Sequence, residues 1–144
     1  MSIEQLTGAW RLRAFEFTDA DGGLFYPLGE TPGGTLVVTP DGHVVFSFCA
    51  GGRASFASDD VFLGTDEERA AATTGYVSFG GPGQVSDDAI TVQVAYSLFP
   101  NWVGSTQIRL YELDGDQLTL GTAGPRLFGG VERTARAVLE RSAG

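Results

Sequence analysis

Hydrophobic and polar residues alternate in short runs along most of the chain, and residues typical of turns separate these runs. Alternation with a period of two is typical of strands that bury one face, so the pattern predicts a mostly β protein. Asp41 and Gly42 form a two-residue turn between two β-branched runs, which is a strong hairpin signal. The predicted strands are 8–17, 35–39, 43–49, 76–79, 89–99, 105–113, 117–122 and 131–141.

One segment, near residues 65–75, departs from this pattern and predicts a short helix. Thr65 and Glu68 have the spacing of a capping box, and acidic residues at 66–68 suit the positive end of a helix dipole. Three alanines follow, which favour a helix, and Gly75 is a plausible end. The alanine content predicts a helix that lies over another part of the protein rather than a large core element.

The strand count indicates the fold class. Residues 131–141 also fit one face of a helix, but the context of the preceding strands favours a strand. About eight mostly sequential antiparallel strands in a chain of this length predict an all-β, eight-stranded antiparallel up-and-down barrel with one short helix. A β-sandwich is the alternative. No linker or repeat interrupts the pattern, so residues 1–144 are predicted to form a single domain.

Charge and composition narrow the choice of partners. The net charge is −9, and all nine basic residues are arginine. Such a balance disfavours nucleic acid and anionic membrane surfaces as partners, and the absence of lysine excludes Schiff-base chemistry and a P-loop. No apolar run is long enough to span a membrane, and the N-terminal residues lack the pattern of a secretory signal. A cytoplasmic location is the expectation.

The residues that commonly ligate metals or act as nucleophiles are sparse. His43 and Cys49 are single in the chain and six residues apart on one predicted strand, so they do not make a metal site without distant carboxylates. Neither a nucleophile elbow nor a dinucleotide fingerprint is present. We therefore expect no metal and no cofactor.

Several stretches resemble the bacterial lipocalin-like domain family. They are "TGAWRL" at 7–12, "PLGE" at 27–30, "SLFPNWVG" at 97–104 and "QIRLYELDGDQLTL" at 107–120. The resemblance implies an eight-stranded barrel with an apolar interior, closed at one end. It also implies that Trp10 plugs the closed end and that Arg141 lies over its ring, both as structural residues. Gly83 stands where an aromatic residue is expected, which would enlarge the cavity or loosen a turn.

Strand alternation selects candidate polar residues inside the barrel. Residues that flank a two-residue hairpin turn share a face, and an inward Leu113 places Tyr111, Arg109 and Gln107 inward as well. Counting from an inward Trp10 places Glu16 inward on the first strand. Glu16, Arg109 and Gln107 are thus the candidate catalytic residues, with Glu16 as the partner of Arg109 or as a general acid or base. The alternative is that Glu16 and Arg109 are exterior or form a structural ion pair.

Aromatic residues are numerous, and some are expected to bind a small, largely apolar molecule. The candidates are Tyr26, Phe46, Tyr76, Tyr96, Trp102 and Tyr111.

Some lipocalin-like barrels are cofactor-free cyclases or isomerases, so the resemblance favours such an activity on an apolar metabolite in natural-product, polyketide-type biosynthesis. Orientation of the substrate and one or two hydrogen bonds would supply the catalysis. A non-catalytic binding or carrier protein is the alternative, and an interior filled by its own side chains is a third.

Ile108 and Leu110 would face outward on one strand, which indicates a possible homodimer.

Overall fold

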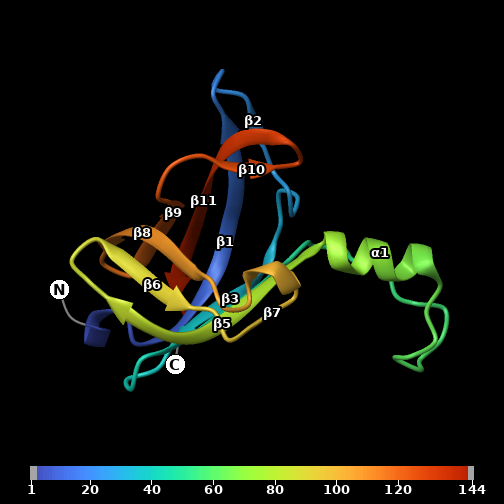
Figure 1. Ribbon diagram of the computed structural model, residues 1–144, viewed down its shortest axis with the longest axis horizontal. Coiled ribbons are helices and arrows are strands. Elements are labelled where there is room, and N and C mark those ends of the chain that lie inside the picture. The colour runs from blue at the N-terminus through green and yellow to red at the C-terminus, as the bar shows by residue number, and fades with distance from the viewer. Residues whose placement is uncertain (1–2, 143–144) are drawn as a thin grey trace.

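The computed structural model describes residues 3–142, and nearly every element in it is a strand (Figure 1). The long strands form one antiparallel ring, and the predicted eight-stranded architecture is confirmed. Two short 3-10 turns, Ile3–Gln5 and Pro100–Trp102, and one α-helix complete the chain. The strands are β1 (Gly8–Asp19), β2 (Leu24–Phe25), β3 (Gly33–Val38), β4 (His43–Cys49), β5 (Tyr76–Val85), β6 (Ala89–Gln93), β7 (Tyr96–Ser97), β8 (Thr106–Asp114), β9 (Gln117–Thr122), β10 (Arg126–Phe128) and β11 (Val131–Arg141).

The ring runs in the order β1, β3, β4, β5, β6, β8, β9 and β11, and β11 pairs with β1 to close it. Closure removes the unpaired edges that an open sheet would expose. The three remaining strands are short and lie outside this path: β2 pairs with β1, β10 with β11, and β7 with β5. Figure 1 shows β2 and β10 together beside the same end of the long strands β1 and β11.

The predicted strand 89–99 is divided into two. β6 ends at Gln93, and Tyr96–Ser97 pairs back onto β5 at Phe79 and Gly80. A pair of glycines explains the division, because a Cβ on Gly80 would lie 2.6 Å from the Tyr96 hydroxyl and one on Gly81 would lie 2.0 Å from the Gln93 carbonyl oxygen. Only glycine allows the chain to approach β5 so closely here.

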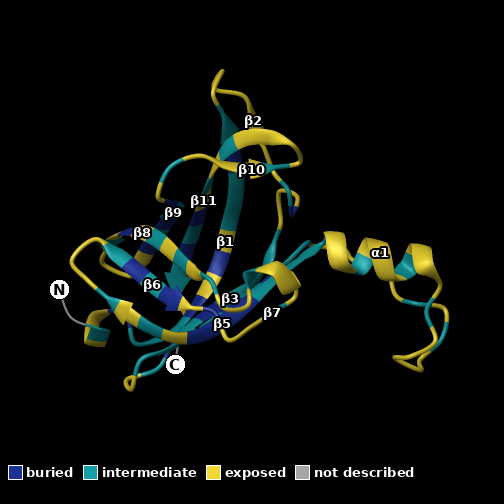
Figure 2. Ribbon diagram, in the orientation of Figure 1, coloured by how far each residue is buried: buried dark blue, intermediate teal, exposed yellow. Residues whose placement is uncertain are grey.

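The helix α1 (Asp66–Thr74) begins as the sequence predicts. Thr65 and Glu68 form a reciprocal capping box, and Gly75 is the C-cap. The helix nevertheless does not lie over the barrel: it projects away from it, and none of its residues is buried (Figure 2). Its alanines are short and contribute helix propensity rather than core packing. Within residues 3–142, no helix is long and apolar enough to cross a membrane.

The core fills one end of the ring. Fully buried side chains at this end come from nearly every strand, and Figure 2 shows the buried segments gathered there. They include Trp10, Leu36, Val38, Val44, Ile90, Val92, Leu118 and Leu139. Gly83 also belongs to this region, because a Cβ there would lie 2.6 Å from Cγ2 of Val44. Its absent side chain therefore allows close packing of β5 and does not enlarge the cavity.

Candidate functional site

The opposite end of the ring holds a cavity of about 750 Å³. Side chains from β1, β4, β5, β8, β9 and β11 form its wall, and the segments around β2, β7 and β10 form its mouth. Thr73 and Thr74, at the end of α1, also line it. A cavity of this size suits a small organic molecule.

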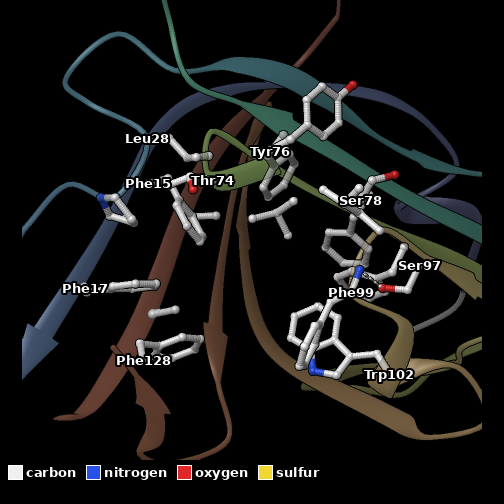
Figure 3. Close-up of a pocket in the computed structure, with 18 of the residues that line it drawn as sticks. Phe15, Phe17, Leu28, Thr74, Tyr76, Ser78, Ser97, Phe99, Trp102 and Phe128 are labelled. Carbon is white, nitrogen blue, oxygen red and sulfur yellow. Dashed lines mark hydrogen bonds between the residues drawn. The ribbon is translucent and has the colours of Figure 1, made fainter. Parts of the chain in front are cut away.

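Aromatic rings dominate the wall. Eight of them form a continuous series, called here the aromatic arc, in which neighbouring ring centroids lie 4.3 to 5.9 Å apart. Figure 3 shows Phe17 and Phe128 at one side of the cavity and Phe99 and Trp102 at the other. Offset and edge-to-face rings of this kind offer contact surfaces for a planar aromatic molecule. In order, the arc is Phe128, Phe17, Phe15, Phe48, Phe46, Phe79, Trp102 and Phe99.

A β-bulge in β1 determines which of its residues face the cavity. Trp10 and Leu12 face inward at even positions, but the pairing with β11 shifts between Leu12 and Ala14. After the shift, Phe15 and Phe17 line the cavity. One inserted residue exchanges the two faces of a strand, so the inward position predicted for residue 16 is wrong.

Glu16 instead lies on the outer face. Its Oε1 accepts a hydrogen bond from Nη1 of Arg136 at 3.1 Å, across the pairing of β1 with β11. Of the two alternatives for Glu16, the exterior ion pair is therefore the one observed, with Arg136 and not Arg109 as the partner. Glu16 is not part of the cavity lining and is not placed to act on a molecule inside it.

Arg109, on β8, lies in the cavity wall. Its guanidinium carbon lies 5.5 Å from the ring centroid of Phe79, and its Nη1 donates to Oε1 of Gln107 at 3.2 Å and to the Ile108 carbonyl at 3.1 Å. Burial, with a smaller contribution from the positive charge of Arg126, lowers the pKa of Arg109 to about 10. The side chain therefore remains a cation at neutral pH, although its surroundings disfavour the charge.

A second arginine, Arg133 of β11, also lines the cavity. It lies over the ring of Phe25 at 5.3 Å, and its Nη1 donates to the Phe128 carbonyl at 2.8 Å. The described lining contains these two arginines and no aspartate or glutamate. In a chain of net charge −9, the interior of this cavity is thus locally positive.

Gln107 and Tyr111 share the inner face of β8 with Arg109 but do not line the cavity. Gln107 holds Arg109 in place, and its own Nε2 donates to Oγ of Ser105 at 3.2 Å. Tyr111 is buried in the core, where its hydroxyl donates to the Ser86 carbonyl at 2.6 Å. Burial raises the pKa of Tyr111, and the charges of two nearby aspartates raise it further. Neither side chain is therefore placed to contact a molecule inside this cavity.

The remaining aromatic candidates are divided between the cavity and the outer surface. Phe46 and Trp102 belong to the aromatic arc. Tyr76 is at the mouth, but its hydroxyl is 2.7 Å from Oγ of Ser47, and Figure 3 shows that hydroxyl turned away from the phenylalanine rings. Tyr96 lies outside the cavity, with its hydroxyl 2.7 Å from Nε2 of His43. Tyr26 is exposed and is also absent from the lining, although its neighbours on both sides contribute to it.

Within the part of the chain that the structure describes, no group of three or more His, Cys, Asp or Glu side chains is placed to hold a metal ion. On the outer face, the His43 ring forms a hydrogen bond with the Tyr96 hydroxyl. Cys49 is half-buried and is paired with Tyr76 of the next strand. The chemistry available in the cavity is thus that of aromatic surfaces, a few hydroxyls and two guanidinium groups.

The fold and the sequence together identify the family. Residues 7–141, nearly the whole chain, match the family described as lipocalin-like domains. The chain belongs to the lipocalin-like domain family. The match confirms the resemblance that the strand motifs indicated.

Two proteins illustrate what this lipocalin-like chain is similar to. The 4'-hydroxy-3'-methoxypropiophenone carrier protein ppsC of Aspergillus oryzae is 34% identical over 90 residues, which cover 57% of this chain and 81% of that protein. A crystal structure of an uncharacterized protein from Bacteroides eggerthii covers 94% of this chain and 98% of its own, with 15% sequence identity and a TM-score of 0.45.

The lipocalin-like resemblance also implied a contact between Trp10 and Arg141 at the closed end, and the structure contains it. The guanidinium carbon of Arg141 lies 4.2 Å from the ring centroid of Trp10. Arg141 donates to the carbonyls of Thr7 at 3.1 Å and Gln5 at 2.9 Å, and the Trp10 indole donates to the Leu6 carbonyl at 2.9 Å. These bonds tie the first turn of the chain to the last strand.

The sequence analysis of this lipocalin-like chain did not select Phe17, Phe128 or Arg133, although all three line the cavity. A signal for Phe17 was present: the apolar positions change from even to odd numbers between Leu12 and Phe15, which marks a bulge. A signal for Arg133 was also present, because it shares the phase of Leu139 and Arg141 on the predicted strand 131–141. No comparable signal exists for Phe128. Its position depends on the short strand β10 folding back onto β11, which local periodicity does not show.

Proposed function

We propose that this protein binds a small, largely apolar aromatic molecule in the cavity and acts as its carrier. The observation that carries the proposal is the aromatic arc, which surrounds a cavity of about 750 Å³ instead of filling it. Binding sites for small molecules typically combine such apolar walls with a few polar groups. The name of the Aspergillus oryzae relative, a carrier of a substituted propiophenone, supports the same class of ligand.

Titration with 4'-hydroxy-3'-methoxypropiophenone, the compound in the relative's name, tests this proposal by calorimetry. Two variants control for the site. Ala135 lines the cavity, so Ala135→Phe should fill it and abolish binding. Thr134, its exposed neighbour, points to the other face of β11, so Thr134→Phe should bind normally. If this compound, 2-acetonaphthone and the aromatic acid 2-naphthoate all fail to saturate the wild type, or if Ala135→Phe binds as well as the wild type, the carrier proposal is wrong.

A second candidate function is cofactor-free cyclisation or isomerisation of the bound molecule. The observation in its favour is Arg109, whose guanidinium faces the cavity and could polarise a carbonyl group where water is scarce. Because Glu16 lies outside, the described lining offers no carboxylate base for such a reaction. Catalysis would therefore depend on orientation and on this one cation. A linear substrate that reacts no faster with the protein than in buffer would exclude this candidate.

A further inference from the structure

The ligand inferred here rests on the proposed function and goes beyond it. Within the described lining of the cavity, the charged groups are the guanidiniums of Arg109 and Arg133. The surroundings of Arg109 disfavour its charge, since burial lowers the pKa of its guanidinium to about 10. A buried charge is costly unless an opposite charge or several hydrogen bonds accompany it.

Among the residues that the structure describes, no acidic side chain forms an ion pair with Arg109. None of the ion pairs formed by residues 3–142 includes Arg109, Arg126 or Arg133. The charge that contributes to lowering the pKa of Arg109 is that of Arg126, and it has the same sign. The guanidinium is therefore held in an apolar site by Phe79 and two neutral oxygens alone.

One edge of the Arg109 guanidinium, formed by Nε and Nη2, donates no hydrogen bond to a described residue. Both bonds that Arg109 donates come from Nη1, which carries two hydrogens, so these bonds account for Nη1 completely. Neither Nε nor Nη2 is fully buried, because every fully buried side-chain nitrogen or oxygen in the described chain has a partner. The free Nε and Nη2 hydrogens form the side-on fork that binds the two oxygens of a carboxylate.

From this geometry we infer that the natural ligand is a planar aromatic acid whose carboxylate pairs with the Nε–Nη2 edge of Arg109 while its ring contacts the aromatic arc. The carboxylate supplies the charge that the cavity lacks. The ring of Phe79, which lies beside Arg109, and that of Trp102, which contacts Phe79, supply the apolar contact. A neutral ketone presents a single oxygen and no charge, so it would use this edge less well.

A matched pair of ligands separates these alternatives. 2-Naphthoate and 2-acetonaphthone share one ring system and differ in that a methyl group of the ketone replaces a carboxylate oxygen. We expect the wild type to bind 2-naphthoate about tenfold or more tightly than 2-acetonaphthone in calorimetry at neutral pH. Arg109→Met should remove this preference by weakening naphthoate binding much more than ketone binding, and the remaining binding of the ketone also shows that the variant is folded. Arg109→Lys keeps the charge but loses the fork, so it should restore only part of the preference.

Two further variants locate the effect. Arg126→Met changes the net charge equally at an exposed position outside the lining, and it should retain the preference. Arg133→Met removes the other cation of the cavity and should retain most of it. Two results would show that the acid does not pair with Arg109 although the carrier function stands. In the first, both ligands bind the wild type but Arg109→Met leaves the ratio of the two affinities unchanged. In the second, Arg133→Met abolishes the preference and Arg109→Met does not. If neither ligand binds the wild type, the carrier function itself fails.

Discussion

Glu16 and Arg136 face each other across the closing pair of strands, with 3.1 Å between Oε1 of the glutamate and Nη1 of the arginine. The arginine side chain is 52% exposed and that of the glutamate 20%. The pair is thus a surface ion pair on the outer face, and the cavity lies on the other side of the same strand. This relationship separates Glu16 from Arg109, which lines the cavity.

Replacing Glu16 tests this separation. Glu16→Gln should leave ligand affinity unchanged, and it should lower the free energy of unfolding by no more than about 1 kcal/mol, because exposed ion pairs contribute little. Calorimetry with 2-naphthoate and urea denaturation measure the two quantities. Arg109→Met serves as the comparison, since it changes a residue inside the cavity. An affinity loss in Glu16→Gln as large as that in Arg109→Met would contradict the outward position of Glu16.

The two tryptophans should respond differently to a ligand. Trp102 lines the cavity and contacts Phe79 and Phe99, whereas Trp10 is fully buried at the closed end beneath Arg141. A ligand that binds on the aromatic arc should therefore quench the emission of Trp102 and leave that of Trp10 unchanged. Fluorescence titration of the single-tryptophan variants measures this directly. Trp10→Phe should keep the quenching and Trp102→Phe should lose it, and the reverse result would place the ligand elsewhere.

The contact of Trp10 with Arg141 should matter for stability and not for binding. Trp10 is fully buried, so Trp10→Ala should lower the free energy of unfolding by about 3–5 kcal/mol. Arg141→Met removes two hydrogen bonds to carbonyls and a cation–π contact, so a loss of about 1–3 kcal/mol is expected. Urea denaturation gives both values. Folded Arg141→Met should still bind 2-naphthoate as the wild type does, and a selective loss of binding would show that the closed end also shapes the cavity.

Much of the fold was predictable because its determinants are local. The turn at Asp41–Gly42 and the capping box of Thr65 with Glu68 depend on residues that are adjacent or three apart, and the structure contains both. Period-two alternation likewise places Gln107, Arg109 and Tyr111 on the inner face of β8. The predicted strands 89–99 and 105–113 also leave a gap at residues 100–104, which lies in the connection between the fifth and sixth strands of the ring.

The errors concern features that depend on contacts between distant segments. A bulge in β1 changes which of its residues face inward, so that Phe17 lines the cavity and Glu16 lies on the outer face. Tyr96 lies outside the cavity because its segment pairs with β5, where Gly80 and Gly81 allow the chain to approach closely. Neither effect follows from propensity alone, because each depends on how two strands pair.

The homodimer stays a prediction. Ile108 and Leu110 are exposed on the outer face of β8, as expected, with 37% and 44% of their surfaces accessible. Sedimentation equilibrium of the wild type and of a variant with Ile108→Thr and Leu110→Thr would test the contact. A dimer that the two substitutions dissociate would support it, and a monomeric wild type would contradict it.

The junction between α1 and the loop before it should depend on pH through Glu68. Its Oε1 accepts a hydrogen bond from the Thr65 amide at 2.9 Å and its Oε2 one from the Ala57 amide at 2.8 Å. The bond to Thr65, followed by the bond to Ala57, lowers the pKa of Glu68 below its ordinary value of 4.5. The ionised form is thus favoured in the folded state, so these bonds are fully present above pH 4.5 and are lost as the pH falls through the lowered pKa.

Amide chemical shifts and hydrogen exchange at Thr65 and Ala57 should therefore change together as the pH is lowered below 4.5. Glu68→Gln removes the titrating group, so the coupled change should disappear in that variant at all pH values. Because α1 has no buried residues, the loss of the cap should loosen the helix without unfolding the barrel. Thr73 and Thr74 at the end of α1 line the cavity. If a bound ligand contacts them, loosening of the helix should also lower the affinity for that ligand. Amides that change only with global unfolding would show that Glu68 does not hold the loop to the helix.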